Sequence, residues 1–190
     1  MKNEIIFASG NKGKIKEVQE ILNEYKIISM NELKIKLEVE EDGKTFEENA
    51  VKKAKTLAKM LEGKMCLADD SGIEIEYLNG FPGVQTKRWK CGTDRDRNLG
   101  IIEKLKGISK ENRKMKFVTA MAISNGLETI TSVEYLKGFV SEEPRGNNGF
   151  GFDEIFELEN GKTLAELSDK EKNKISARKK SIQVLREKLK

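Results

Sequence analysis

Two adjacent carboxylates, Asp69 and Asp70, are the residues of this sequence with the clearest capacity for chemistry. They follow an apolar run at residues 65–68 and precede Ser71 and Gly72. An acidic pair at the end of a buried strand has a desolvation cost, and it is a common way to hold Mg²⁺ near a substrate. Because neighbouring strand residues point in opposite directions, only one carboxylate is expected to face the site. The alternative is a polar turn whose aspartates cap backbone N–H groups.

The 190 residues include no histidine and only two cysteines. This excludes a Ser-His-Asp triad, a Cys-His pair and a histidine-based zinc site. Acid–base chemistry must therefore use Asp, Glu, Lys or Tyr, and a metal would be Mg²⁺ or Mn²⁺ bound by oxygen. The acidic stretch from Glu38 to Glu48 could supply a second ligand, and the sequence does not choose among Glu40, Glu41 and Glu48. The alternative is a solvated loop that leads into a helix.

A turn that could bind phosphate follows the first apolar run of the chain. N–H groups at the start of a helix attract anions, and lysines add positive charge. The residues of this turn are Ser9, Gly10, Asn11, Lys12, Gly13 and Lys14. Their spacing fits neither the Walker A pattern nor G-x-G-x-x-G, so an ordinary turn with solvated lysines is the alternative.

Glycines alternate with phenylalanines in a segment near residue 150. Such a segment lets a ring and the backbone approach a flat ligand closely. The segment is Gly146-Asn147-Asn148-Gly149-Phe150-Gly151-Phe152-Asp153. Asp153 could accept hydrogen bonds from a base or a ribose, whereas the alternative is a loop whose phenylalanines return to the core.

Basic residues gather at the C-terminus, where residues 168–190 contain nine basic and three acidic side chains. They could bind a triphosphate, or they could simply keep a helix solvated. The whole chain carries a net charge of only +4, which does not indicate a nucleic-acid-binding protein. Together, a phosphate turn, paired carboxylates, an aromatic loop and a basic segment predict a nucleotide ligand and metal-assisted phosphoanhydride hydrolysis.

Alternating strands and helices must position these groups. Apolar runs and alternation predict strands at residues 5–8, 27–30, 65–68, 73–78, 117–123, 129–140 and 153–156. Helical periodicity predicts helices at residues 15–25, 45–61 and 94–105 and a final helix from Ser168 onward. Asn125-Gly126 indicates a hairpin, Asp94 is a predicted cap, and the forms Thr45-x-x-Glu48, Thr163-x-x-Glu166 and Ser168-x-x-Glu171 indicate capping boxes. The sequence therefore predicts a mixed α/β protein.

The apolar runs and the cysteine spacing bear on where the protein is located and on the state of its thiols. No stretch approaches the roughly 18 apolar residues of a membrane span, and the N-terminus lacks the apolar run of a signal peptide. Cys66 and Cys91 show no framework spacing, so reduced thiols in a cytoplasmic protein are expected.

Six segments, in this order, resemble the inosine/xanthosine triphosphate pyrophosphatase family along the whole chain. They are Ser9-Gly10-Asn11-x-x-Lys14, Thr45-Phe46-x-Glu48-Asn49-Ala50-x-x-Lys53-Ala54, Ala68-Asp69-Asp70-Ser71-Gly72, Gly80-x-Pro82-Gly83-Val84 with Arg88, Gly149-Phe150-Gly151-Phe152-Asp153 and Glu171-Lys172-Asn173-x-Ile175-Ser176-x-Arg178. The resemblance implies a single domain over residues 1–190. It also implies an elongated, two-lobed α/β fold around a long mixed sheet with flanking helices, an active-site cleft between the lobes, and a homodimer.

The resemblance implies catalytic roles for Asp70 and Lys14, with Glu41 and Asp70 as ligands of Mg²⁺ or Mn²⁺. Asp70 would also activate the water. The substrate-binding residues that it implies are Ser9, Gly10, Asn11, Lys12, Gly13, Lys14, Lys53, Ser71, Phe150, Gly151, Phe152, Asp153, Lys172, Ala177 and Arg178.

Within that set, the triphosphate would lie on the turn at residues 9–14. Phe152 would stack on the purine, and Lys172 and Arg178 would read its 6-oxo edge. The implied reaction is hydrolysis of ITP, dITP and XTP between the α and β phosphates, which would cleanse the nucleotide pool. The same chemistry with a different base preference, or a nucleotide- or RNA-binding protein without catalysis, are the alternatives.

The chain departs from the family pattern at three places. Ala177 stands where the family usually has a histidine that contacts the base, which bears on purine selectivity. Glu154 replaces the usual proline, a change interpreted as neutral from the sequence. Residues 85–87 also differ from the small, aromatic-led stretch that usually precedes Arg88.

We expect Ala177→His to tighten selectivity for ITP, because it restores a polar contact to the base. The measurement is pyrophosphate release from ITP and GTP with Mg²⁺. An unchanged ITP-to-GTP ratio would refute this expectation.

Overall fold

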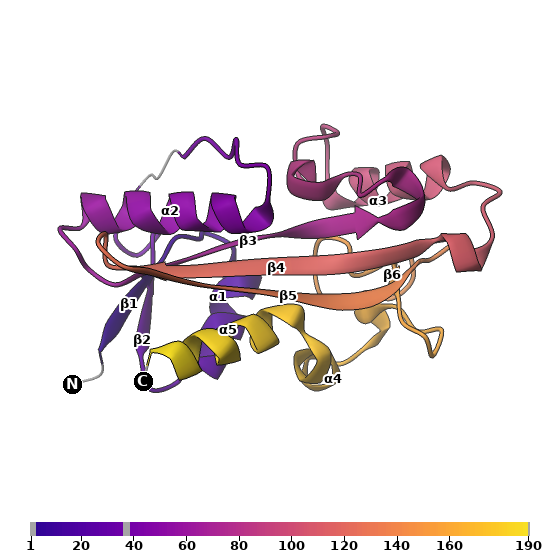
Figure 1. The fold of residues 1–190 in the computed structure, drawn as a ribbon. Coiled ribbons are helices and arrows are strands. Elements are labelled where there is room, and N and C mark those ends of the chain that lie inside the picture. The colour runs from indigo at the N-terminus through magenta and orange to yellow at the C-terminus, as the bar shows by residue number, and fades with distance from the viewer. Residues whose placement is uncertain (1–2, 36–38, 190) are drawn as a thin grey trace. The chain divides into compact units, whose positions relative to one another are not determined.

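The computed structural model describes residues 3–35 and 39–189 and confirms the α/β class (Figure 1). A six-stranded sheet has the order β2-β1-β3-β4-β5-β6. Its strands are β1 (Glu4–Phe7), β2 (Lys26–Ser29), β3 (Cys66–Ile75), β4 (Lys114–Ser124), β5 (Thr129–Val140) and β6 (Phe156–Glu157). The α-helices are α1 (Lys12–Ile21), α2 (Phe46–Met60), α3 (Asp94–Lys104), α4 (Asp169–Ile175) and α5 (Ala177–Lys188). The sheet is mixed, since β1 pairs in parallel with β2 and β3 whereas β5 and β6 are antiparallel.

The chain divides into two compact units. Unit 1 comprises Met1–Ser71, Thr119–Glu134 and Ala177–Lys190, and unit 2 comprises Gly72–Val118 and Tyr135–Ser176. Strands β3, β4 and β5 contribute residues to both units.

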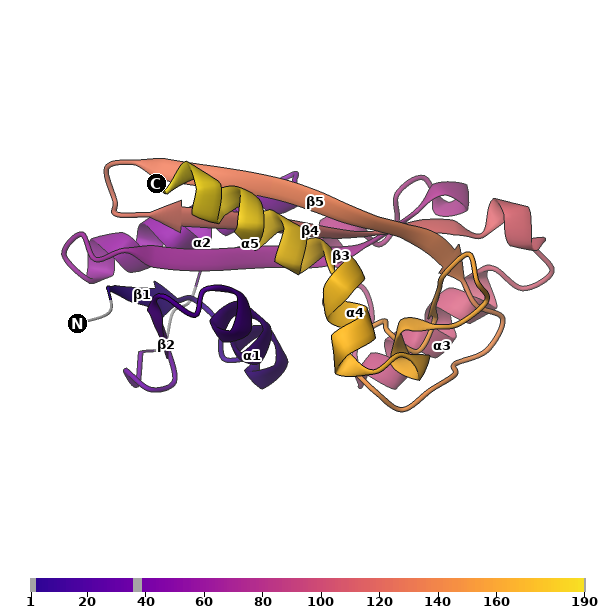
Figure 2. The same ribbon diagram turned by 90° about the horizontal axis from the view of Figure 1, so that it is seen from below.

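Unit 1 is a layer of strands with helices on both faces (Figures 1 and 2). Helices α1 and α5 cover one face, where their buried side chains pack on alternate residues of the strands. This core contains Ile5, Phe7, Val18, Leu22, Ile27, Leu67, Met121, Ile123, Ile182 and Leu185. Helix α2 covers the other face with Ala50, Ala54, Leu57 and Ala58, at the spacing of a helical stripe.

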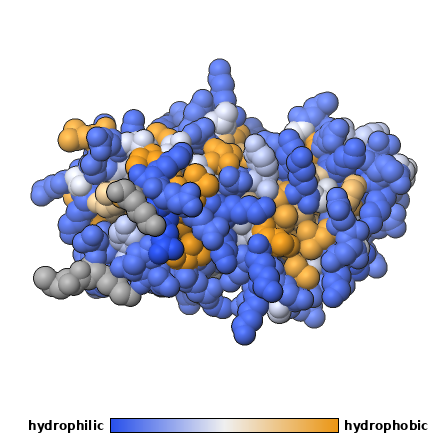
Figure 3. Space-filling view, turned by 60° about the horizontal axis from the view of Figure 1, so that its bottom comes forward, coloured by the Kyte–Doolittle hydropathy of each residue, from blue (hydrophilic) through white to orange (hydrophobic). Residues whose placement is uncertain are grey.

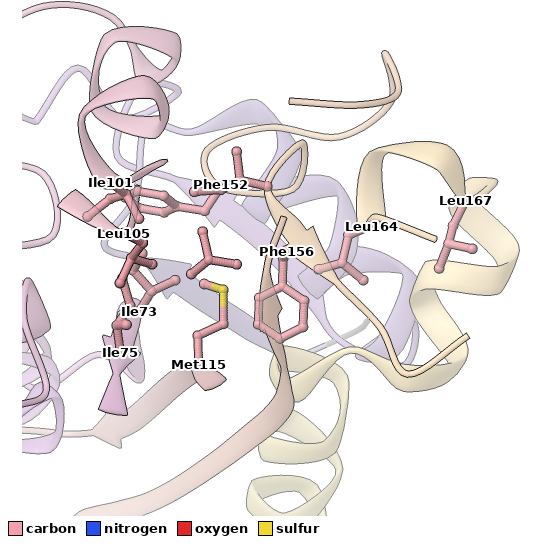
Figure 4. Packing of buried hydrophobic residues seen from close by; sticks show 11 residues of the cluster. Ile73, Ile75, Ile101, Leu105, Met115, Phe152, Phe156, Leu164 and Leu167 are labelled. Carbon is pink, nitrogen blue, oxygen red and sulfur yellow. The ribbon is translucent and has the colours of Figure 1, made fainter. Parts of the chain in front are cut away.

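Unit 2 has its own hydrophobic core (Figure 4). It is built from the C-terminal parts of β3 and β5, from α3, from β4 and from the segments around β6. Its buried residues are Ile73, Ile75, Ile101, Leu105, Met115, Val140, Phe152, Ile155, Phe156, Leu164 and Leu167.

The strand predictions require three corrections. The Asp69–Asp70 pair lies inside β3 and not at a strand end, because β3 continues to Ile75. The strand predicted at residues 153–156 begins only at Phe156, since residues 151–155 form a turn. The strand predicted at residues 73–78 is the last part of β3 and ends at Ile75, since Glu76–Leu78 form a 3-10 helix. The hairpin predicted at Asn125-Gly126 is confirmed, and its connection is residues 125–128. The Asn125 side chain accepts hydrogen bonds from the N–H groups of Leu127 and Glu128 and so stabilises this loop.

The helix predictions also change. The predicted final helix is two helices, because Ser176 between α4 and α5 has an extended ψ of 125°. Helix α3 is capped by Thr93 and not by Asp94: Thr93 and Asp96 form a reciprocal capping box. The box predicted at Thr45 is incomplete, since Glu48 bonds to the N–H of Lys44 instead.

Hydrophilic side chains cover most of the face in Figure 3, and hydrophobic ones form small groups between them. Among the described residues, no helix has the length and apolar character needed to cross a bilayer.

We expect Thr93→Ala to lower the free energy of unfolding by about 1 kcal/mol, the usual cost of losing an N-cap side chain. Urea denaturation followed by circular dichroism measures the change. Gln183→Ala, on the exposed face of α5, is the control. Equal denaturation midpoints for Thr93→Ala and the control would show that the cap contributes nothing.

Candidate active site

Strand β3 directs its two adjacent aspartates to opposite faces of the sheet in unit 1. Asp69 contacts Lys14 and Arg178, which belong to α1 and α5. Asp70 contacts residues of α2, which covers the other face. This confirms the expectation that the two neighbouring side chains point in opposite directions.

On the Asp70 face, helix α2 supplies an amide and a cation one turn apart. Asn49 Nδ2 donates to Asp70 Oδ2 at 3.1 Å, and Lys53 Nζ lies 3.1 Å from Asp70 Oδ1. Lys53 Nζ also lies 3.0 Å from Glu41 Oε1. Glu41 and Asp70, which are far apart in sequence, therefore converge on one ammonium group.

Asn49 is a buried part of this site to which the sequence analysis gave no role. Its side chain oxygen accepts from the N–H of Gly43 at 2.8 Å while its amide nitrogen binds Asp70. Asn49 thereby ties the acidic segment to β3. Its position one helical turn before Lys53 was the signal that could have revealed it.

Burial is the largest influence on Asp70 and raises the pKa of its carboxyl above the usual range. Lys53 and Asn49 oppose this effect, while the neighbouring Glu41 carboxylate adds to it. Burial also acts on Lys53, but the carboxylates of Asp70, Asp69 and Glu41 outweigh it and raise the lysine pKa. Asp70 is thus a carboxylate that holds a proton more readily than an ordinary aspartate.

The oxygen donors on this face fit a hard divalent cation. Glu41 and Asp70 already share one cation, and Mg²⁺ is usually bound by one or two carboxylates together with substrate phosphates and water. Within residues 3–35 and 39–189, no group of three or more acidic or cysteine side chains forms a complete protein cage. Glu48 is engaged at the start of α2, and Glu38 lies outside the described residues. The geometry therefore favours Glu41 as the partner of Asp70.

On the opposite face, Asp69 is the centre of a buried ion-pair network. Lys14 Nζ lies 2.7 Å from Asp69 Oδ2, and Arg178 Nη2 lies 3.4 Å from the same oxygen. Ser71 donates to Asp69 at 3.2 Å, and Arg178 also pairs with Glu17. Burial alone would raise the pKa of Asp69, but Lys14, Arg178 and Lys53 hold it well below the usual range.

This network separates residues that the resemblance had grouped. Lys14, a predicted catalytic partner of Asp70, pairs with Asp69 instead. Ser71 and Lys53, both predicted to bind the substrate, contact aspartates on different faces of β3. Arg178, a predicted reader of the base, is a buried member of the Asp69 network.

The turn at residues 9–14 is the start of α1. Asn11 caps the helix by accepting from the Lys14 N–H at 3.1 Å, and Ser9 accepts from the Asn11 N–H at 3.2 Å. Lys12 and Gly13 occupy the first turn, where a helix leaves N–H groups without intrahelical partners. Asn31, which follows β2 in the sequence, donates to the Gly10 carbonyl at 3.4 Å and so stabilises the turn. These features suit an anion.

In unit 2, Asp153 organises the aromatic–glycine segment. Its Oδ2 accepts from the Phe150 N–H at 2.7 Å and from Lys172 Nζ at 2.7 Å. Lys172 Nζ also lies 4.6 Å from the centre of the Phe150 ring. Gly149 has φ +82°, and a Cβ there would lie 2.1 Å from Asp153 Oδ2, so only glycine permits this turn.

Phe152 requires a correction. Its side chain is only 6% exposed and packs in the core of unit 2 beside Ile101 (Figure 4). The predicted stacking of Phe152 on a purine is therefore wrong, and the alternative of a phenylalanine that returns to the core is the correct interpretation. Phe150, which is partly exposed, is the ring that can meet a base.

Ala177 is the first residue of α5 and is 4% exposed. Where the family usually has a histidine, this chain therefore carries a small buried methyl group that cannot donate or accept a hydrogen bond.

Residues 5–188 match the Ham1 family. This chain belongs to the Ham1 family. The resemblance inferred from the six sequence segments is thereby confirmed.

Two curated relatives of this Ham1 chain carry the name dITP/XTP pyrophosphatase. The protein of Bacillus subtilis (strain 168) is 46% identical over 182 residues, which cover 92% of this chain and 91% of the relative. The protein of Clostridium perfringens (strain 13 / Type A) is 41% identical over 196 residues, which cover 97% and 96%.

Solved structures of other Ham1 proteins share the fold. The Staphylococcus aureus Ham1 protein superposes with a TM-score of 0.88 at 37% identity and covers 98% of each chain. A nucleoside-triphosphatase / dITP/XTP pyrophosphatase from Mycobacterium abscessus has a TM-score of 0.78 at 35% identity, and the match covers 96% of this chain and 98% of that chain.

Asp69 and Asp70 are expected to make the stability of the fold depend on pH in opposite directions. The folded pKa of Asp69 lies below its unfolded value, so its ionisation stabilises the fold above about pH 3.9, and this stabilisation is lost as the pH falls toward the folded pKa. The folded pKa of Asp70 is raised, so stability is lost as the pH rises through it. At pH 7 without divalent ions, we expect Asp69→Asn to cost about 3–5 kcal/mol and Asp70→Asn to raise the melting temperature.

Thermal unfolding between pH 3 and pH 8 in the presence of a chelator tests this pair. Wild-type protein is expected to lose stability at the acid end, and Asp69→Asn is expected to flatten that dependence. Equal melting temperatures of the two variants at pH 7 would contradict the assignment.

Proposed function

We propose that this chain hydrolyses dITP, ITP and XTP to the monophosphate and pyrophosphate, with Mg²⁺ or Mn²⁺ as cofactor. The observation that carries the proposal is the convergence of Glu41 and Asp70 on one cation, Lys53. The names of the full-length relatives support the substrate class.

When bound, the metal ion would supply positive charge at the phosphate oxygens and a lowered pKa of coordinated water. Asp70 and Glu41 would hold it. The raised pKa of Asp70 suits a carboxylate that accepts the proton of the attacking water. The water oxygen forms a bond to phosphorus, the anhydride bond between the α and β phosphates breaks, and pyrophosphate leaves.

The remaining roles follow the chemistry of the residues. We assign the phosphates to the first turn of α1, where Lys12, Gly13 and Lys14 lie, and to Lys53. We assign the base to Phe150, Asp153 and Lys172, which join a ring, an acceptor and a cation in one turn of unit 2. Gly151 supports that turn through its backbone.

A second candidate is the same reaction with a different base preference. Ala177 favours it, because a buried methyl group cannot donate or accept a hydrogen bond. The family resemblance implies a homodimer, which we include in the proposal. The two unpaired cysteines suit a cytoplasmic location.

The test is pyrophosphate release from dITP, ITP, XTP, dGTP and dATP with and without Mg²⁺. We expect turnover of the first three, its loss with a chelator, and a fall of about 10²–10⁴-fold in kcat for Asp70→Asn. Asp42→Asn, which changes an exposed carboxylate of the same acidic segment, should keep wild-type activity.

Three results would contradict parts of this proposal. Equal rates on dITP and dATP favour the second candidate. Salt-dependent RNA binding without turnover favours a binding protein. Near-normal activity of Asp70→Asn removes Asp70 from its assigned role.

A further inference from the structure

The turn at residues 149–154 of unit 2 belongs to no helix or strand. Such a segment keeps one conformation only through the bonds that it makes with its surroundings. Gly151, at its centre, has φ +66°, and a Cβ there would meet no atom within 4 Å. Neither a side chain nor close packing restrains this residue, so its hydrogen bonds must do so.

Helix α3 makes those hydrogen bonds. Asn98 Nδ2 donates to the Gly151 carbonyl at 2.9 Å, and Asp94 Oδ2 accepts from the Gly151 N–H at 3.2 Å. Asp94 and Asn98 are four residues apart and lie on one face of α3. The N–H and the carbonyl of Gly151 are therefore both hydrogen-bonded to side chains of α3.

The same asparagine also binds the end of the turn. Asn98 Nδ2 donates to Glu154 Oε1 at 2.8 Å, and Arg95 lies 3.0 Å from Glu154 Oε2. The carboxylate of Glu154, which stands where the family usually has proline, therefore links the turn to α3. Asn98 is 1% exposed whereas the Arg95 side chain is 63% exposed, so the asparagine bond is the stronger restraint.

Asn98 does this at a cost to stability. Its Oδ1 is buried and, among the described residues, has no hydrogen-bond donor. An unsatisfied buried acceptor is destabilising, and an apolar side chain would avoid it. The residue is better explained by the two bonds that its nitrogen makes to the turn than by a contribution to the core.

We propose that Asn98 is a positioning residue that sets base discrimination by holding the turn that presents Phe150 and Asp153. The inference rests on the proposed function and deepens it. Phe152 anchors the turn in the core, and Asp153 fixes the Phe150 N–H. Asn98 holds the Gly151 carbonyl between these two points, and Asp94 holds the Gly151 N–H.

The test compares kcat/KM for dITP with kcat/KM for dATP in wild-type protein and in Asn98→Asp. This change keeps the side-chain volume but removes the donor, and it places a carboxylate beside Glu154. We expect the dITP-to-dATP ratio to fall about tenfold, mainly through a higher KM for dITP. A loss of folded protein lowers both rates equally and leaves the ratio unchanged.

Asn112→Asp is the matched control, because Asn112 is an exposed asparagine of unit 2 whose side chain bonds to Ser109. Its ratio should equal that of wild-type protein. If Asn98→Asp does not fold, Asp94→Ala decides, since the Asp94 side chain is 50% exposed and its loss still frees the Gly151 N–H. We then expect a fall of about threefold in the ratio.

The outcomes separate the two claims. A wild-type protein that does not hydrolyse dITP overturns the proposed function and, with it, this inference. A wild-type protein that hydrolyses dITP, together with an unchanged ratio in folded Asn98→Asp, overturns the inference alone.

Discussion

Neutralisation of two carboxylates within one buried strand is the constraint that organises unit 1. Asp69 and Asp70 are consecutive in β3, so the alternation of the strand sends one to each face. A buried carboxylate needs a cation or strong donors. Each face must therefore supply its own, and it does: Lys14 and Arg178 for Asp69, and Lys53 for Asp70. The helices that carry these cations are tied to the sheet by charge as well as by hydrophobic packing.

The two faces of the sheet give the neighbouring aspartates opposite electrostatic environments. Asp69 is surrounded by cations and its pKa is held low, so it remains ionised and binds α1 and α5 to the sheet. Asp70 has a raised pKa and a second carboxylate, Glu41, nearby, which is an arrangement that a divalent cation would relieve. Perturbed carboxylates of this kind are typical of functional sites. One strand thus carries two neighbouring aspartates whose pKa values are shifted in opposite directions.

In unit 2, the main constraint is that the irregular turn at residues 149–154 must be held in one conformation. Gly149 is required by the closeness of Asp153, Phe152 anchors the turn in the core, and Asn98 binds its centre. The Phe150 ring and the Asp153 carboxylate both lie in contact with Lys172. Preorganisation of this kind is what discrimination between similar bases demands.

Local patterns in the chain were enough to predict most helices, the apolar strands, the α/β class and the opposed directions of Asp69 and Asp70. They also carried the family, because six motifs occur in order. They did not reveal that Lys14 serves Asp69, that Phe152 is core and Phe150 is not, or that Glu154 is held by α3. Those facts depend on contacts between residues far apart in sequence, such as Arg178 with Asp69. A short-range pattern records which faces are apolar, but not which distant charge or helix will lie against them.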